Sequence, residues 1–124
     1  MNSKMKFNSI LLYISNVETS SDFYQKLGFK IDTKDDKSVT VSLENLQLQL
    51  FDKEKVEFKQ YSEVDPNTFS VFFYIEVDDV DEKYKELISN DLTPTTTPKD
   101  WSWGNREFVI KDPDGYKFII YKKI

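Results

Sequence analysis

The stretch LLYISNVETSSDFYQKLGF, residues 11–29, decides the fold of this chain. Its first residues are apolar and β-branched, which is typical of a buried strand. Asn16 can then cap a helix and Gly28 can end it, and apolar residues recur at helical spacing between them. The stretch therefore predicts a strand over 6–14, followed by a helix over 16–29 that packs against a sheet.

The same order of elements returns in the second half of the chain. After the first helix, the sequence predicts three short strands, at 29–34, 38–43 and 46–52. A polar segment with one proline then predicts a linker, at about 53–68. Beyond it we expect a strand at 69–77, a helix at 78–90, and strands at 92–98, 105–111 and 116–123, the last two joined by the turn DPDG. Each half therefore reads β-α-β-β-β.

Composition narrows the classes of function. The 124 residues suit one domain with a real core, and no apolar run approaches the length of a membrane span or a signal sequence. The formal net charge of −5 disfavours nucleic acid as a partner. The chain has neither cysteine nor histidine, so it lacks the commonest nucleophile, general base and metal ligands. We expect a cytoplasmic protein that contacts neither nucleic acid nor membrane.

Two motifs carry a family resemblance. LLYISNVETSSDFYQKLGF resembles the opening module of the vicinal-oxygen-chelate superfamily, which contains glyoxalases, bleomycin-resistance proteins and dioxygenases. WGNREFVIKDPDGYKFIIY, residues 103–121, resembles its closing module, so the resemblance covers essentially the whole chain. It implies an α+β fold of two β-α-β-β-β modules, each forming a half-cup of mixed sheet. We expect one domain over 1–124, with module one at about 1–52 and module two at about 69–124.

The resemblance also fixes where a metal would bind. Metal-dependent members place one ligand on the first strand and one on the last strand of each module. In this chain those positions fall on residues that include two apolar side chains: Ser9, Gln49, Phe72 and Ile119. Such a set cannot hold a first-row metal or zinc, which needs imidazole, thiolate or carboxylate ligands. We therefore expect no metal and no cofactor.

The superfamily includes metal-free members that confer resistance by binding bleomycin- or phenazine-type compounds in an aromatic cavity. The resemblance to those members predicts that this chain sequesters a planar aromatic small molecule, such as a toxic natural product or antibiotic. Half-cups from two chains of a dimer can also enclose a cavity, and unpaired sheet edges favour pairing, so we expect a homodimer. One alternative is a glyoxalase-like lyase or dioxygenase, or a metal-free acid–base enzyme using Glu76, Tyr13 or Tyr74. Another is a module that binds a protein through exposed aromatic rings.

The alternation of side chains along a strand predicts which residues lie on the concave face. Side chains two apart share a face of a strand, and counting back through a turn at 112–115 places Phe108 opposite Ile119. Glu107 then points away from this face. The predicted ligand-binding residues on the strands are Tyr13, Gln49, Phe51, Phe72, Tyr74, Arg106 and Phe108. The alternatives are that the rings only fill the space between sheets and that Arg106 forms a structural ion pair.

Both tryptophans lie in the loop DWSWGN, residues 100–105, just before a strand. A loop indole offers a flat stacking surface, so Trp101 and Trp103 complete the predicted ligand-binding set. We expect the two indoles to point to opposite sides, with one of them covering the pocket. The alternative is that both pin the loop to the core.

Overall fold

The computed structural model describes residues 5–55 and 71–124. The chain divides into two compact units, unit 1 (Met1–Ser62) and unit 2 (Glu63–Ile124), and each unit contains one sheet and one helix. The linker predicted at 53–68 lies outside the described residues apart from its first three positions. No helix in the described ranges is long and apolar enough to cross a membrane.

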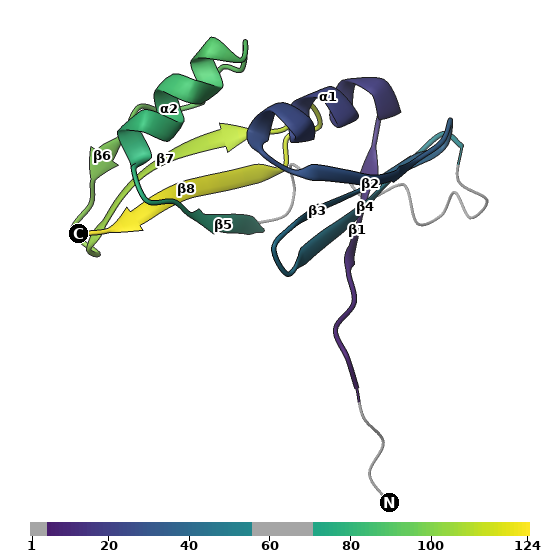
Figure 1. Ribbon diagram of the computed structural model, residues 1–124, viewed down its shortest axis with the longest axis horizontal. Coiled ribbons are helices and arrows are strands. Elements are labelled where there is room, and N and C mark those ends of the chain that lie inside the picture. Colours follow the sequence, from purple (N-terminus) through teal and green to yellow (C-terminus); the bar gives the residue numbers. More distant parts are fainter. Residues whose placement is uncertain (1–4, 56–70) are drawn as a thin grey trace, which may run out of the picture. The chain divides into compact units, whose positions relative to one another are not determined.

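Unit 1 is a four-stranded mixed sheet with a helix on one face (Figure 1). The sheet has the order β1-β4-β3-β2, in which β1 runs parallel to β4 and the other neighbours are antiparallel. Its elements are β1 (Ile10–Ile14), α1 (Val17–Leu27), β2 (Lys30–Lys34), β3 (Ser38–Leu43) and β4 (Leu46–Asp52).

Helix α1 begins and ends at the residues that the sequence indicates. The side chain of Asn16 accepts a hydrogen bond of 2.8 Å from the backbone N–H of Thr19, which satisfies one of the free donors of the first turn. Gly28 ends the helix with φ of 123°, a conformation that favours glycine. Between these caps, Tyr24 is fully buried and contacts Phe23 and Phe29 edge to face. These rings join α1 to the sheet and form the centre of the unit 1 core.

Unit 2 repeats this arrangement with a sheet of order β5-β8-β7-β6. Strands β5 and β8 are parallel, and β8, β7 and β6 are antiparallel neighbours. Its elements are β5 (Phe72–Glu76), α2 (Val80–Ser89), β6 (Lys99–Asp100), β7 (Asn105–Lys111) and β8 (Lys117–Lys123). The fold predicted from the sequence, two β-α-β-β-β modules in an α+β arrangement, is confirmed.

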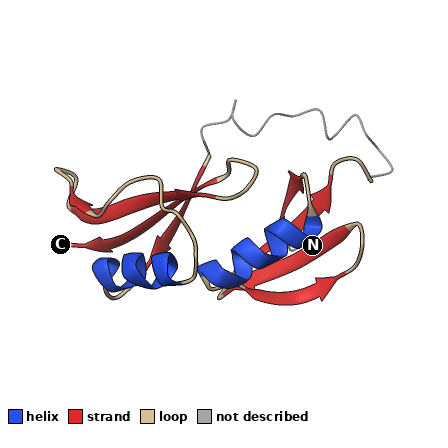
Figure 2. Cartoon of the chain, turned by 90° about the horizontal axis from the view of Figure 1, so that it is seen from above, coloured by secondary structure: helices blue, strands red, loops and turns tan. Residues whose placement is uncertain are grey.

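The core of unit 2 lies between α2 and one face of its sheet (Figure 2). Asp79 caps α2 by accepting a hydrogen bond of 3.0 Å from the backbone N–H of Glu82. Phe118 is fully buried and stacks on Phe73, and Phe108 contacts Tyr84 of the helix edge to face at 5.2 Å. In each unit one face of the sheet is therefore covered by the helix, and the opposite face, here called the helix-free face, is not.

Two predictions about strands are wrong, the start of the first strand and the strand at 92–98. Strand β1 begins at Ile10 rather than at residue 6. Residues 92–98 form no strand, and the third strand of the module is the short β6 after them. Pro94 and Pro98 lie within that segment, and because proline cannot donate a ladder hydrogen bond, the regular ladder with β7 begins only at Lys99.

Candidate functional site

The helix-free face of unit 1 combines two rings with neutral polar groups. Tyr13 lies opposite Phe51 in the pairing of β1 with β4, and Leu11 lies opposite Gln49. The alternating residues Leu48 and Leu50 are fully buried on the helix side, so these four residues share the other face, as alternation predicts. The side-chain amide of Gln49 donates a hydrogen bond to the hydroxyl of Ser9. This face therefore offers aromatic and hydrogen-bonding surface without a formal charge at these positions.

On the helix-free face of unit 2, neighbouring residues of adjacent strands form rows across the sheet. Some of these rows are aromatic and others are charged. One row joins Tyr74, Ile119 and Val109, which are direct neighbours on β5, β8 and β7. Tyr74 also contacts Tyr121 edge to face at 5.5 Å. The side chains of Phe72 and Tyr74 are 43% and 57% exposed, which is unusual for large rings on a sheet.

The remaining rows of this face carry charge. Strand pairing aligns Phe72 with Lys117 and Lys111 at one end of the face. At the other end it aligns Glu76, Tyr121, Glu107 and Lys99, the last of these on β6. Glu107 is only 6% exposed, and Asn105 donates a hydrogen bond of 3.3 Å to its carboxylate. Charged groups thus flank the aromatic centre on both sides.

The predicted register of the last two strands is wrong by one residue. Phe108 lies opposite Ile120 and not Ile119, because Asp112 pairs with Tyr116 and the turn lengthens accordingly. A slip of one residue exchanges the faces of a strand. Phe108 is therefore 1% exposed against α2, where it is a core residue, and Glu107 points to the helix-free face.

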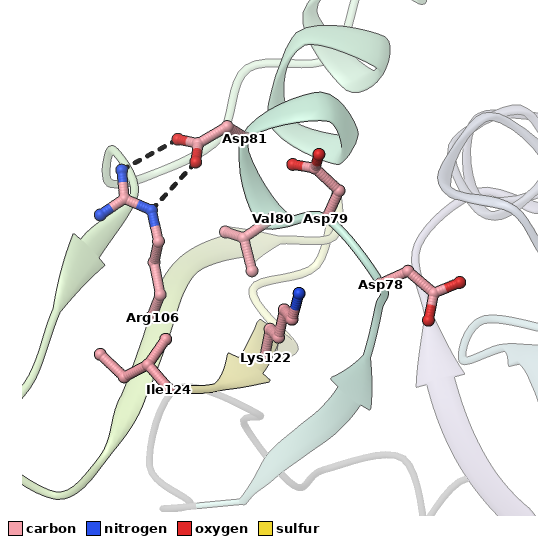
Figure 3. Close-up of a pocket in the computed structure, with 7 residues that line it drawn as sticks. All are labelled: Asp78, Asp79, Val80, Asp81, Arg106, Lys122 and Ile124. Atoms are coloured by element: carbon pink, nitrogen blue, oxygen red, sulfur yellow. Dashed lines mark hydrogen bonds and ion pairs between the residues drawn. The ribbon is translucent and has the colours of Figure 1, made fainter.

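The same slip moves Arg106 to the helix side of the sheet (Figure 3). Its guanidinium forms two hydrogen bonds with the carboxylate of Asp81 on α2, at 2.9 and 3.0 Å, and a third of 3.0 Å with Asp100. These hydrogen bonds raise the pKa of Arg106 above its ordinary value, and the hydrogen bonding to Asp81 has the largest effect. The hydrogen bond from Arg106 likewise lowers the pKa of Asp81. The sequence left two roles open for Arg106, ligand binding and a structural ion pair, and in the structure it forms the ion pair.

Arg106 also borders a pocket of about 240 Å³ at the start of α2 (Figure 3). The pocket is lined by Asp78, Asp79, Val80, Asp81, Arg106, Lys122 and Ile124. Its acidic groups are in part already used, since Asp79 caps the helix and Asp81 holds Arg106. This pocket is not among the sites predicted from the sequence, because no motif in the sequence marks it.

The two tryptophans stack on each other instead of pointing to opposite sides. Their ring centroids are 4.6 Å apart and their planes differ by 9°. Gly104 has a φ of 93° and donates its N–H to the carbonyl of Trp101, and Trp101 donates to the carbonyl of Asn105 at 2.8 Å. Residues two apart share a face even in an extended segment, so Trp101 and Trp103 belong on the same side and the prediction of opposite sides is wrong.

The indole stack is exposed and lies beside the helix-free face of unit 2. The Lys99 ammonium is 4.0 Å from the centroid of the Trp101 ring, and Lys99 is the β6 neighbour of Glu107. Trp103 is 59% exposed and Trp101 37%. The two rings therefore do not fill the core, and Trp103 offers the larger free surface.

Comparison with known proteins places this architecture in a family. A family model of the Glyoxalase/Bleomycin resistance protein/Dioxygenase superfamily matches residues 6–120. The chain belongs to this superfamily. No curated protein sequence matches it.

Solved structures similar to the chain include a bleomycin-binding protein, a bleomycin resistance determinant and a lyase. A bleomycin-binding protein complexed with bleomycin is 20% identical with a TM-score of 0.67, covering 97% of this chain and 100% of that one. A bleomycin resistance determinant encoded on transposon Tn5 is 21% identical with a TM-score of 0.69, covering 96% and 98%. Lactoylglutathione lyase from Agrobacterium tumefaciens is 20% identical with a TM-score of 0.69, covering 96% and 94%. At these identities the likeness establishes the superfamily fold alone.

The metal positions of the superfamily do not fit a metal in this chain. In unit 1 they supply a hydroxyl and a neutral amide, those of Ser9 and Gln49, which are hydrogen-bonded to each other. In unit 2 they supply the hydrocarbon side chains of Phe72 and Ile119. Within the ranges that the structure describes, no three acidic, histidine or cysteine side chains gather where they could hold a metal.

Proposed function

We propose that this chain is a metal-free binding protein that sequesters a planar aromatic small molecule, such as a toxic natural product of the bleomycin or phenazine type. The observation that carries the proposal is the exposed aromatic surface of unit 2. Phe72, Tyr74 and the indole stack present large rings to solvent on or beside one sheet face. Rings held in this way by a rigid sheet and a tight turn are suited to stack on a flat ligand.

The donor chemistry supports binding without a metal. A neutral amide, a hydroxyl and two hydrocarbon side chains cannot activate a bound oxygen, so the metal-dependent reactions of the superfamily have no support in this chain. Stoichiometric binding of an aromatic ligand needs only a surface that contacts its rings and polar groups that match its own. The solved structure of a bleomycin-binding protein with its ligand shows that the superfamily fold can serve this purpose.

In this proposal Trp103 stacks on the ligand and Trp101 supports it from behind. Trp103 is the more exposed of the two rings and has Trp101 on one face. Phe72 and Tyr74 extend the surface over the sheet. Tyr13, Gln49 and Phe51 remain proposed ligand-binding residues on the helix-free face of unit 1.

The test is a titration of the protein with phenazine, a neutral flat compound, followed by indole fluorescence and by calorimetry. We expect quenching and one bound phenazine per chain. Trp103→Ala should weaken binding by about 1–3 kcal/mol, as measured for stacking of a base on an aromatic side chain. Trp101→Ala should weaken it less, because the Trp101 ring supports Trp103 and is less exposed.

A matched control separates stacking from general apolar binding. Ile88 is also an exposed apolar residue, at 48%, but it lies on α2, so Ile88→Ala should bind phenazine like the wild type. Far-UV circular dichroism checks that each variant is folded. Wild-type affinity in both tryptophan variants, or no binding of phenazine to the wild type, would refute the proposal.

We further propose that the protein is a two-fold dimer in the cytoplasm. The sheets of both units end in strands without a second neighbour among the described residues, namely β1 and β2 in unit 1 and β5 and β6 in unit 2. An open strand edge favours pairing with another strand. A second copy of the chain supplies such a strand at equal concentration.

A further inference from the structure

Two lysines face each other at one end of the helix-free face of unit 2. Lys111 and Lys117 are direct neighbours in the antiparallel pairing of β7 with β8. Both lie on the face of Ile119. Lys117 is two positions from Ile119 on β8, and Lys111 is two positions from Val109, the neighbour of Ile119, on β7. Like charges directly opposite each other destabilise a sheet. The fold alone gives no reason for this pair.

Within the described ranges, no acidic side chain forms an ion pair with either lysine. Neither Lys111 nor Lys117 forms an ion pair with any residue that the structure describes, whereas other lysines of the chain do. Those paired lysines are Lys26, Lys34, Lys55, Lys83 and Lys85. Other described lysines, such as Lys30 and Lys122, form no ion pair either, so what distinguishes Lys111 and Lys117 is that they face each other across two strands.

Among the described residues, the acidic ones in the turn between the two lysines are Asp112 and Asp114, and those of the helix-free face lie at its far end. Asp112 follows Lys111 directly, but its side chain is buried and accepts hydrogen bonds from the backbone N–H groups of Asp114 and Tyr116. The acidic residues of the helix-free face, Glu76 and Glu107, lie in the row of Tyr121. That row is four residues along β8 from Lys117, about 13 Å at the usual rise of a strand.

An aromatic ring stands beside the Lys117 ammonium. Phe72 is the neighbour of Lys117 on β5, and the Lys117 ammonium is 5.3 Å from the centroid of its ring. Phe72 is 43% exposed, so part of its ring is free to contact a ligand. A ring and two cations side by side match the two parts of an aromatic acid, its flat ring and its anionic group.

We infer that Lys111 and Lys117 bind the anionic group of an aromatic acid whose ring lies against Phe72, in a subsite at the end of the helix-free face opposite to the indole stack. The inference rests on the proposed function and names the class of compound that the helix-free face of unit 2 selects. The bound carboxylate supplies the negative charge that the lysine pair lacks.

The test compares two probes that differ by one carboxylate, phenazine and phenazine-1-carboxylate, by calorimetry. The wild type should bind phenazine-1-carboxylate more tightly than phenazine. In the double variant Lys111→Met/Lys117→Met the affinity for the carboxylate should fall about tenfold or more, as expected for a lost charged hydrogen bond, and the affinity for phenazine should stay within about twofold. Methionine keeps an apolar stem of similar length, so the variant loses charge and little packing.

The control has the same net charge. Lys26→Met/Lys85→Met removes two lysines from the helices of the two units and should leave both affinities unchanged. The preference of the wild type for the carboxylate should also shrink when ionic strength rises from about 0.01 M to about 1 M, where the screening length falls from about 30 Å to about 3 Å.

The outcomes separate the two proposals. Equal affinity of the wild type for both probes, or an equal loss of both in the Lys111→Met/Lys117→Met variant, would overturn the anionic subsite and leave the proposed function standing. Failure of the wild type to bind either probe would overturn the proposed function and the subsite with it.

Discussion

Replacement of Phe108 by alanine tests which face of the unit 2 sheet binds the ligand. Phe108 is 1% exposed, lies opposite Ile120 on β8 and contacts Tyr84 of α2 edge to face. Phe72 is the same residue type on the same sheet, but it is 43% exposed on the helix-free face. The pair Phe108→Ala and Phe72→Ala therefore makes one chemical change on the two opposite faces.

The expected loss of stability differs between them because the two rings differ in burial. A buried phenylalanine removes about 150–250 Å² from water, and at about 25 cal/mol per Å² this corresponds to about 4–6 kcal/mol for the whole ring. Measured replacements of buried phenylalanine by alanine cost about 3–5 kcal/mol, including the cavity that remains. The edge contact with Tyr84 accounts for about 0.5–1.5 kcal/mol. For Phe72→Ala we expect about 1 kcal/mol or less.

Urea unfolding followed by indole fluorescence measures these losses. Both tryptophans of the chain lie in unit 2, so their fluorescence reports on the unit that contains both substitutions. Phe108→Ala should lower the midpoint by more than about 1 M urea, given a slope of about 1–3 kcal/mol per M. If this variant does not fold, Phe108→Leu keeps most of the apolar volume and should show the same direction with a smaller shift.

Binding of phenazine-1-carboxylate, measured without urea on folded protein, should show the opposite order. Phe72→Ala should lose affinity because the ring beside Lys117 is gone, and Phe108→Leu should keep it. An unchanged urea midpoint for Phe108→Ala would refute the placement of this ring in the core. A loss of ligand affinity in folded Phe108→Leu with none in Phe72→Ala would refute the assignment of the ligand to the helix-free face.

Two further predictions concern acid stability and assembly. Arg106 lowers the pKa of Asp81 below its ordinary value of 3.8, so their ion pair stabilises the fold above that value and loses this contribution as pH falls through the lowered pKa. Asp81→Asn should therefore unfold in less urea than the wild type near neutral pH, and the difference should shrink below about pH 4; a constant difference down to pH 2 would contradict the ion pair as its source. Light scattering should give the mass of a dimer at micromolar concentration, and a monomer there would remove the support for pairing at the open strand edges.

The sequence by itself determined the local structure and the order of the elements. Asn16 and Gly28 mark the ends of α1 because a helix terminus needs an acceptor for its free N–H groups and a residue that tolerates a positive φ. Alternation placed Gln49 and Phe51 on one face of β4 because side chains two apart share a face within a single strand. These features depend on residues close in the chain, and such interactions can be read along it.

The tertiary structure alone decided which residues share a face between strands. The face of Phe108 and Arg106 depends on whether the turn before β8 closes at residue 115 or at Tyr116, and a difference of one residue exchanges the faces of the whole strand. The indole stack lies at the tight turn between β6 and β7, where Gly104 has a positive φ and Trp101 pairs with Asn105. The Lys111–Lys117 pair and its neighbour Phe72 come from three strands, and only strand pairing brings them together. Charge and ring positions on the candidate surface are thus set by pairing between distant segments, for which a single sequence carries no local signal.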